Sequence, residues 1–425
     1  MLKAFPTVNL YDFLAIIFDY LLSSEDYPAL MSKDYDVLII GAGPGGSTAA
    51  ALLAKQGIRT AIVEKDEFPR FKIGESLLPY STDILRKSGA MEVVDSGKYI
   101  RKYGAQFIDH RFENEIYFEF KEGLDSDHPY AFEVVRSEFD KDLLEYAKSL
   151  GVDVFQPESV KSVLEKEEHI ELQTTERTLT ASYVIDASGR NALMGRKKKL
   201  RSSTQEFNNI AVFTHFKNTK RGLGEREGDI TIGVLPDHCW SWIIPFKGNE
   251  CSVGIVLDAK KHSKAEFTED LIREKLSCHP KFNEILENAE SIRPVQMASN
   301  YSERCSELTG PRWLLLGDAA GFLDPVFSSG VHIALKSADI ASEVLTDAVK
   351  TNRLITETEL GQNYANDLFK GMIRFRSLLR LFYHTDFVSS MQKVLHRPNT
   401  LRAFTSAVGG DMWNDKNPLF SNNVL

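Results

Sequence analysis

The residues whose spacing most clearly predicts chemistry are three glycines that lead into a helix. From residue 35 the chain reads YDVLIIGAGPGGSTAAALLAKQGIRTAIVEKD, an apolar strand, a glycine-rich turn, an Ala/Leu-rich helix and a second strand. Gly41 permits the tight turn, Gly43 lets the backbone approach a pyrophosphate, and Gly46 lets the helix pack closely on the strand. Glu64 ends the second strand, where its carboxylate can accept hydrogen bonds from the ribose hydroxyls of an adenosine, and Lys65 follows it. The pattern predicts a dinucleotide site that suits either NAD or FAD.

Three later segments favour FAD. In GPRWLLLGDAAGFLDP, residues 310–325, an apolar strand runs into a turn where Asp318 can bind the ribityl or pyrophosphate part of a flavin. The helix that follows has N-terminal amides, among them those of Gly330 and Val331, that can face the flavin ring. The segment VIDASGRNA, residues 184–192, predicts a further strand-to-turn crossing of the same domain. In residues 134–152, Arg136 heads an amphipathic helix, where it suits an anionic cofactor group or is a charge on the helix surface.

Two of the four tryptophans stand one residue apart in HCWSWIIPF, residues 238–246. A strand places residues i and i+2 on one face, so Trp240 and Trp242 present two indoles side by side. The pair predicts either a wall that separates two compartments or a filling of the core face of a sheet, which aromatic residues often provide.

Together these segments resemble a group of flavin-dependent oxidoreductases that contains the aromatic hydroxylases, the geranylgeranyl-reductase-like enzymes and the flavin-dependent halogenases. The resemblance extends from Met31 to about residue 345. It implies an α/β fold, with a Rossmann-like FAD-binding domain like that of p-hydroxybenzoate hydroxylase, an inserted mixed β-sheet substrate domain and a helical C-terminal region. The expected ranges are 31–110, 131–200 and 295–345 for the FAD-binding domain, 111–130 and 201–294 for the substrate domain, and 346–425 for the helical region.

Within this group, three features resemble the halogenases. WSWIIP matches their W-x-W-x-I-P motif, which in that family is thought to keep the organic substrate away from the flavin. FLDPVFSSG, residues 322–330, fits F-x-x-P-x-x-S-x-G, so that Ser328, Ser329 and Gly330 are the expected halide site at the positive end of a helix dipole. The register of RKYGAQF against the phenol- and pyrrole-acting halogenases puts Lys102 at the essential lysine, with Arg101 as a second candidate. Glu75, in FKIGESLLP, resembles the family's flavin-proximal glutamate.

The resemblance implies a halogenase that uses reduced FAD and oxygen to make hypohalous acid from chloride or bromide. The acid would pass the tryptophan pair and meet Lys102, whose buried ammonium has a lowered pKa and either hydrogen-bonds the acid or forms a haloamine. The halogen would then add to an electron-rich aromatic ring. A glutamate stands beside the active-site serine in tryptophan halogenases, but FSSG contains no acid, which favours phenolic or pyrrolic substrates and leaves the base unidentified. The implied partners are an NAD(P)H-dependent flavin reductase and an aromatic small molecule or an acyl or peptidyl carrier protein.

Composition sets further limits on the function. A chain of 425 residues, 43% hydrophobic and 26% charged, can bury one large core or two. Its net charge of −9 argues against a nucleic-acid surface. Four cysteines without metal-type spacing indicate reduced thiols, no metal site and a cytoplasmic protein. The apolar stretch at residues 9–22 contains Asp12 and Asp19, so we expect neither a membrane span nor a signal peptide, and residues 1–30 are an accessory extension or a start-site artefact.

Three other functions fit parts of the same pattern. In a flavin hydroxylase or epoxidase the tryptophan pair would line a pocket, and an isoprenoid double-bond reductase shares the GAGPGGS and GDAAG segments. The third alternative is a flavin-binding module without catalysis. Residues 368–396 have helical apolar spacing and predict helices over the substrate mouth or a purely structural cap, whereas the tail from Val408 predicts a loosely ordered end.

Overall fold

The first sheet is built on the apolar strand that precedes the glycine turn. In the computed structural model, which describes residues 33–111, 115–262, 267–384, 386–394 and 396–421, β1 (Tyr35–Ile40) pairs in parallel with β2 (Thr60–Val63) and β10 (Thr178–Asp186). The strand order of this sheet is β17-β18-β10-β1-β2-β7, where β7 is Asp153–Phe155, β17 is Thr309–Gly310 and β18 is Trp313–Leu315. Two further strands, β9 (Ile170–Thr174) and β8 (Val160–Glu165), extend the sheet antiparallel from β10. Continuous apolar runs such as LII and TAIV are typical of parallel strands buried on both faces. The predicted extension at residues 1–30 falls outside the described residues.

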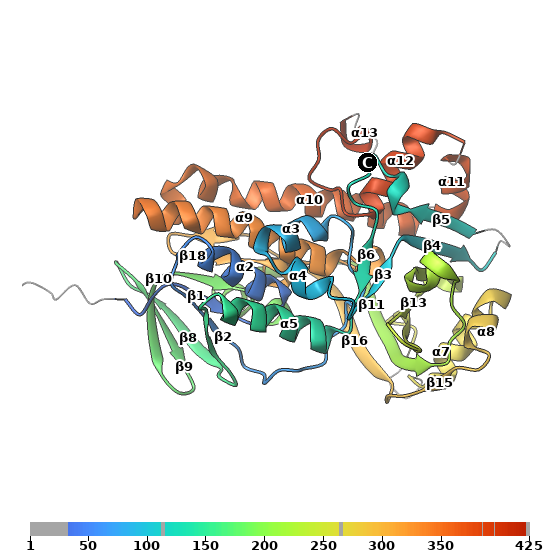
Figure 1. Cartoon of the computed structure of the whole chain (residues 1–425), viewed down its shortest axis with the longest axis horizontal. Helices are drawn as coiled ribbons and strands as arrows, with labels where there is room; N and C mark the ends of the chain where they lie inside the picture. Colours follow the sequence, from blue (N-terminus) through green and yellow to red (C-terminus); the bar gives the residue numbers. More distant parts are fainter. Residues whose placement is uncertain (1–32, 112–114, 263–266, 385, 395, 422–425) are drawn as a thin grey trace, which may run out of the picture. The chain divides into compact units, whose positions relative to one another are not determined.

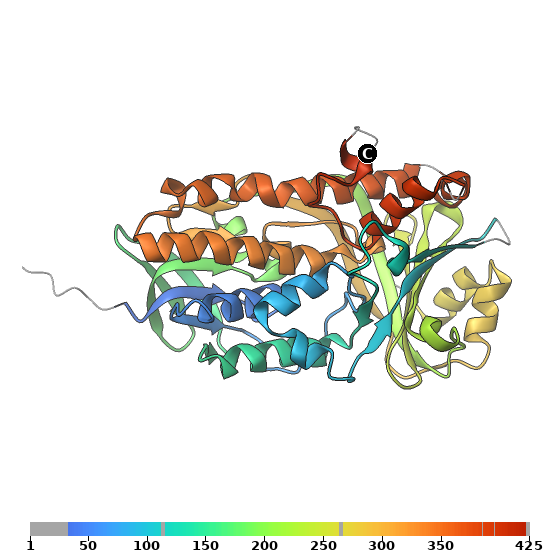
Figure 2. The same cartoon turned by 45° about the horizontal axis from the view of Figure 1, so that its top comes forward.

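Long helices cover this sheet. α2 (Pro44–Ala54) packs against α5 (Arg136–Ser149) and α9 (Ser329–Thr351), and α10 (Glu359–His384) packs on α9. Figures 1 and 2 show α9 and α10 side by side. The glycine turn and the FSSG turn are therefore brought together because they begin two helices that lie in contact.

The tryptophan strand lies inside a second, mixed sheet of order β19-β16-β11-β14-β13-β12-β4-β5, with β15 paired to β11. Both faces are buried: alternate residues of β13 belong to two separate apolar clusters, one with Trp240 and Trp242 and the other with Ile243. The strands are β4 (Gly104–Asp109), β5 (Glu115–Glu119), β11 (Arg201–Lys217), β12 (Ile230–Val234), β13 (Trp240–Pro245), β14 (Glu250–Asp258), β15 (Glu290–Ser291), β16 (Gln296–Cys305) and β19 (Gly321–Phe322).

A two-stranded sheet, β3 (Ile100–Lys102) with β6 (Ala131–Glu133), completes the strands that position the site. The remaining α-helices are α3 (Ser81–Ser88), α4 (Met91–Val94), α6 (Leu193–Lys197), α7 (Glu269–Leu276), α8 (Pro280–Leu286), α11 (Phe387–Val394), α12 (Pro398–Val408) and α13 (Pro418–Ser421). The α/β class, the second mixed sheet and the helical C-terminal region confirm the predicted fold. The division into domains at the expected residue numbers stays a prediction, and β4 and β16 are strands of the second sheet.

For residues 408–421, the described part of the tail, the prediction of a loosely ordered end is wrong. Met412 and Asn417 have no exposed surface, and the amide of Asn417 donates to the carbonyl of Ala403 at 3.2 Å. The tail contains few apolar residues, so its sequence did not show that it packs against α10 and α12.

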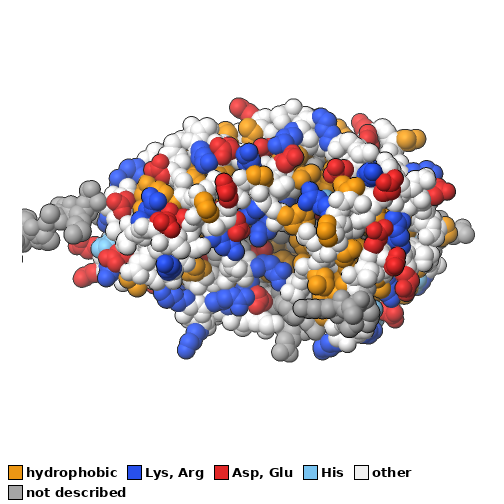
Figure 3. Space-filling model, turned by 90° about the horizontal axis from the view of Figure 1, so that it is seen from below, with side chains coloured by type: hydrophobic (Ala, Val, Ile, Leu, Met, Phe, Trp, Pro, Cys, Tyr) orange, Lys and Arg blue, Asp and Glu red, His pale blue; other side chains and the backbone are white. Residues whose placement is uncertain are grey.

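On the face drawn in Figure 3, basic and acidic side chains are interspersed. Within the described residues, no helix has the length and apolar character needed to cross a membrane. The four cysteines are free thiols, and in the same part of the chain no cluster of His, Cys, Asp and Glu side chains is arranged to hold a metal ion.

Candidate active site

The glycine turn has the geometry of a phosphate-binding loop. Gly41 has φ of +102°, and a Cβ there would lie 2.5 Å from the carbonyl oxygen of Ala187, so only glycine fits. A Cβ at Gly46 would overlap the Gly41 carbonyl, because the start of α2 packs directly on the turn. At Gly43, by contrast, the nearest atom to a Cβ would be 3.7 Å away, so the backbone is open to approach from outside. A pyrophosphate fits this open side, at the N-terminus of α2.

The acid after β2 is directed at the same turn. Glu64 is 4% exposed, and its Oε2 accepts a hydrogen bond from the Ala42 amide at 2.7 Å while its Oε1 accepts one from Asp66 at 2.9 Å. A carboxylate held in this way still has lone pairs for ribose hydroxyls. Lys65, the next predicted contact, is exposed.

Arginines surround the stretch between the phosphate turn and the flavin end. Arg136 forms a two-pronged ion pair with Asp140, at 2.8 and 3.0 Å, and its Nη1 donates to the carbonyl of Ile73 at 2.6 Å. Nη1 of Arg70 also forms an ion pair with Oδ2 of Asp140, at 2.8 Å. The predicted anion-binding arginine therefore also fixes the backbone that leads into GESLLP. Asp318 is half-buried near Arg136, and burial raises the pKa of its carboxyl.

The FSSG turn presents helix amides next to this stretch. Ser328 has φ of +54° and lies directly before α9, which begins at Ser329. A helix of this length begins with amide groups that have no partner within the helix. Gly330 has no atom within 4 Å of an added Cβ, and a Cβ at Gly74 would lie 3.9 Å from Val331, so the turn is open beside the GESLLP segment. A halide ion fits such a position, because the amides and the helix dipole are both positive there.

Lys102 and Ser328 line one narrow cavity of about 10 Å³, which has room for about one water molecule. The other residues around it are apolar: Leu78, Ala105, Phe107, Phe120, Ile230, Ile232, Val326, Phe327 and Val408. In the described part of the chain, no cysteine, methionine, tyrosine or tryptophan lines it. Lys102 is 1% exposed and lies 5.4 Å from the centre of the Phe120 ring. Burial lowers the pKa of its amine, as predicted from the sequence. Arg101 points the other way, because it is exposed and pairs with Asp95 at 2.8 Å.

A buried cluster of hydrogen bonds holds Lys102. Its Nζ donates to the hydroxyl of Ser76 at 2.7 Å, and that hydroxyl donates to Oε1 of Glu133 at 3.1 Å. Glu133 is 1% exposed, and burial raises the pKa of its carboxyl to about 8. Glu75 pairs instead with Nε2 of His215 at 3.0 Å, and both are buried. The sequence did not reveal Ser76 or Glu133, although Ser76 stands directly after the glutamate of the GES triplet.

The two indoles lie behind the lining of this cavity. Trp240 and Trp242 are 3% and 7% exposed, with ring centres 5.8 Å apart. Trp242 is the strand partner of Ile232, which lines the cavity, and its ring lies over Gly254, where any Cβ would overlap it. The indoles therefore pack as a buried layer on the cavity side of the second sheet, with alternate residues of β13 facing away.

Tyr383 joins the tryptophan strand to the FSSG turn. Its hydroxyl accepts from Nε1 of Trp240 at 2.8 Å and donates to Oδ2 of Asp324 at 2.9 Å. Asp324 in turn accepts from the amide of Val326 at 3.2 Å. Trp242 has a separate acceptor, Ser252, at 3.0 Å. Tyr383 lies in α10, where helical periodicity alone made it one aromatic among several.

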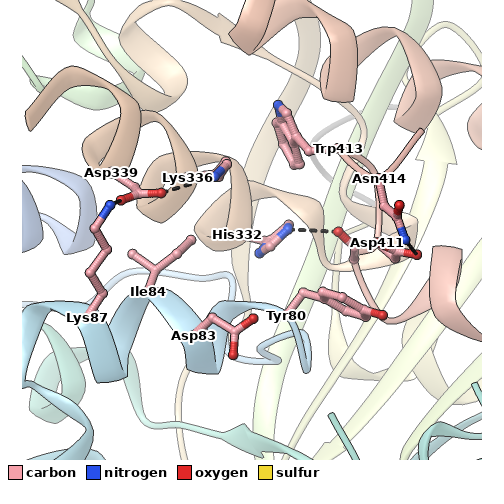
Figure 4. Close-up of a pocket in the computed structure, with 11 residues that line it drawn as sticks. Tyr80, Asp83, Ile84, Lys87, His332, Lys336, Asp339, Asp411, Trp413 and Asn414 are labelled. Carbon is pink, nitrogen blue, oxygen red and sulfur yellow. Dashed lines mark hydrogen bonds and ion pairs between the residues drawn. The ribbon is translucent and has the colours of Figure 1, made fainter. Parts of the chain in front are cut away.

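A second pocket, of about 320 Å³, lies between α3, α9 and the C-terminal tail (Figure 4). Its lining includes Tyr80 and Gly410, while Leu78 and Val408 line the Lys102 cavity. The amide of Tyr80 donates to the carbonyl of Gly409 at 3.2 Å. Two short segments, 78–80 and 408–410, thus line both hollows and lie side by side between them.

This combination of a phosphate turn, an adenosine-type acid and a helix start beside a narrow cavity defines a flavoprotein, and comparisons with known proteins identify its kind. The family described as FAD binding domain matches residues 34–352. The 1H-pyrrole-2-carbonyl-[peptidyl-carrier protein] chlorinase of Pseudomonas fluorescens is 34% identical, over 91% of each chain. The corresponding brominase of Pseudoalteromonas luteoviolacea is 32% identical, over 83% of this chain and 87% of its own. The solved structure of the flavin-dependent brominase Bmp2 has a TM-score of 0.82 and 27% identity, over 92% of this chain and 98% of that one.

The chain belongs to the flavin-dependent halogenases, as the resemblance predicted, and it is an FAD-dependent oxidoreductase. Chloride and bromide are both halides of its relatives. The hydroxylase, reductase and non-catalytic alternatives are set aside on the same grounds.

Proposed function

We propose that the protein passes hypohalous acid from the FSSG turn to Lys102, which halogenates an electron-rich aromatic ring. One observation carries the proposal: the cavity that Ser328 and Lys102 share has Lys102 as its only strongly nucleophilic side chain among the described residues. Hypohalous acid attacks amines, thiols, thioethers, phenols and indoles far faster than aliphatic groups, as the ready oxidation of Cys and Met illustrates. An oxidant that crosses this cavity therefore meets Lys102 before any other reactive group.

FAD would bind along the glycine turn and Glu64, with its flavin end towards the GESLLP and FSSG turns. Bound as reduced FAD, it supplies, with oxygen, the oxidising power that converts halide into hypohalous acid. The amides at the start of α9 would hold the halide, since they are the positive groups beside that end. A separate NAD(P)H-dependent reductase in the cytoplasm would provide the reduced FAD.

The substrate class follows from the missing acid and from the relatives. FSSG carries no carboxylate beside Ser328, so the ring must be activated by its own hydroxyl or nitrogen. Two relatives act on a pyrrole carried by a peptidyl carrier protein, which makes a pyrrolyl carrier and free phenols the first acceptors to test.

The decisive assay combines purified protein, FAD, a flavin reductase, NADH, oxygen and bromide with a pyrrolyl carrier protein or an activated phenol. We expect a brominated product by mass spectrometry, and none from Lys102→Met, which should still bind FAD and consume oxygen. Arg101→Met is the matched control, because it removes the neighbouring exposed cation without entering the cavity. Normal bromination by Lys102→Met would refute the lysine assignment, and a hydroxylated product would refute halogenation.

The path itself can be tested with a thioether. Ile232→Met puts a sulfur atom into the cavity lining, whereas Ile243→Met puts one on the opposite face of the same sheet. We expect methionine sulfoxide only at position 232 after turnover with bromide, with a matching loss of brominated product. Equal oxidation at the two positions would mean that the oxidant reaches the protein from bulk solution.

A further inference from the structure

The fold contains a buried acid that the halogenation chemistry described so far does not use. Glu133, the last residue of β6, is 1% exposed, and its Oε2 has no hydrogen-bond partner among the described residues. Burying a carboxyl oxygen without a partner costs free energy, so such a group in a native fold needs an explanation. Its other oxygen, Oε1, accepts from Ser76, which accepts from Lys102.

The hydroxyl of Ser76 bridges the amine of Lys102 and the carboxyl of Glu133. Nζ of Lys102 lies 3.9 Å from Oε1 of Glu133, and the Ser76 hydroxyl lies within hydrogen-bond distance of both. A hydroxyl is both donor and acceptor, so it can pass a proton between an amine and a carboxylate. The other ionisable groups near Glu133 are Glu75, which is bound to His215, and Asp229, which accepts from the amides of Tyr103 and Gly104. The positive charge of Lys102 opposes the rise in the pKa of Glu133 that burial causes.

We propose that Glu133 is a positioning residue for Lys102, which exchanges protons with its amine through Ser76 and so supplies the acid and the base that ring halogenation needs. This inference rests on the proposed function. It fills a gap in the site, since the FSSG turn has no carboxylate to take the ring proton.

The first step needs the amine without its extra proton. With that proton on Glu133, the neutral amine attacks hypohalous acid: the nitrogen–halogen bond forms, the oxygen–halogen bond breaks, and one amine hydrogen leaves with the hydroxide as water. Burial favours this neutral pair, because it lowers the pKa of Lys102 and raises that of Glu133.

The second step needs the stored proton. The ring carbon takes the halogen, the nitrogen–halogen bond breaks with its electron pair on nitrogen, and the nitrogen gains the proton of Glu133 through Ser76. The halogenated ring then loses its own proton to the amine, which passes it back to Glu133. The sum is haloamine plus aromatic ring giving amine plus haloaromatic ring, with Glu133 protonated before and after.

The proposal predicts where the reaction stalls in Glu133→Gln. The amide keeps the shape but cannot hold or release the proton, so the haloamine should form and then persist. We expect ring bromination to fall by about 10²-fold, the usual scale for acid–base catalysis, while a mass increase of bromine in place of hydrogen accumulates on Lys102. In wild type the transfer step should slow as the pH rises above about 8, where Glu133 loses its proton, and this limb should be absent in Glu133→Gln.

Two further variants separate a relay from a structural role. Ser76→Ala removes the bridge and leaves both ionisable groups, Lys102 and Glu133, in place, and it should give the same long-lived haloamine. Glu133→Asp, which keeps the carboxylate, should restore part of the transfer rate. Bromination and haloamine decay at wild-type rates in both Glu133→Gln and Ser76→Ala would overturn the relay alone. Absence of brominated product from wild type with every acceptor would overturn the proposed function, and the relay with it.

Discussion

Replacing Tyr383 by phenylalanine should uncouple the tryptophan strand from the turn that begins α9. The Tyr383 hydroxyl accepts from Trp240 at 2.8 Å and from Asn209 at 3.0 Å, and it donates to Asp324 at 2.9 Å. Asn209 retains a second bond to Asp324, at 3.1 Å. In the variant, the indole N–H of Trp240 loses this acceptor. The donor is then left unpaired inside the protein, because Trp240 is only 3% exposed.

The magnitude follows from these contacts. A buried donor left without its acceptor costs about 1–3 kcal/mol, and a lost hydrogen bond to a charged group about 1.5–3 kcal/mol. We therefore expect Tyr383→Phe to lower the free energy of unfolding by roughly 2.5–6 kcal/mol. Because Asp324 also caps the Val326 amide at 3.2 Å, the FSSG turn should become less well fixed.

Urea unfolding measures the stability, and the ratio of brominated product to oxygen consumed measures the effect on the site. Ser252→Ala is the matched control: it removes the acceptor of the other indole, Trp242, at 3.0 Å, at a position within β14. We expect both variants to be destabilised and only Tyr383→Phe to lose product per oxygen. Equal product ratios in the two variants would refute the coupling, and an unchanged free energy of unfolding in Tyr383→Phe would refute the hydrogen-bond argument.

Two other features of the structure give direct tests. Gly254→Ala should displace the Trp242 ring, because its Cβ would overlap the indole, so we expect a loss of about 1–3 kcal/mol in urea unfolding and a changed tryptophan fluorescence; unchanged fluorescence would contradict the packing. His332 is buried with its pKa lowered from 6.5 to about 4, so the unfolded chain binds a proton that the folded chain does not as the pH falls between these values. Because of His332, the free energy of unfolding should therefore fall by about 2 kcal/mol as the pH is lowered from 7 to 5. His332→Gln should remove this contribution to the pH dependence of the free energy of unfolding.

The cofactor end of the site could be predicted from sequence because it consists of local signals. The strand, glycine turn, helix and acid are contiguous, and Gly41 must be glycine for reasons of φ and space that its position in the pattern already indicates. The fold class was implied by the family resemblance, to which these signals contribute. Lys102 could be placed only by its register against the family, since a lysine in isolation reads as a surface charge.

The groups that surround Lys102 could not be predicted, because they meet only in the folded chain. Ser76 follows a loop segment and Glu133 ends a three-residue strand, and nothing in either stretch points to the other. Tyr383 lies in a helix with several aromatic residues. The helical apolar spacing explains all of them equally well, so the sequence did not single out Tyr383. The tail was misjudged because packing against a neighbouring helix, rather than its own composition, orders it.

The cavity between Ser328 and Lys102 is lined by several separate parts of the chain, which are expected to have different roles. β3 supplies Lys102, β12 of the second sheet supplies Ile230 and Ile232, and the turn before α9 supplies Phe327 and Ser328. In the proposed function, these three walls face the path of the oxidant. Val408, at the end of α12, belongs to neither sheet, and the segment that follows it also lines the second pocket.

The C-terminal wall is therefore the part of the cavity that can change without altering how the oxidant is made. We expect Val408→Ala to change the relative rates for a pyrrolyl carrier and a free phenol while leaving oxygen consumption with bromide unaltered. Ile230→Ala, in a wall tied to the lysine, is the comparison, and it should lower bromination of both acceptors together. If Val408→Ala instead lowered both rates equally, substrate selection would have to be assigned to the other apolar residues of the lining, among them Ile230 and Ile232 of β12.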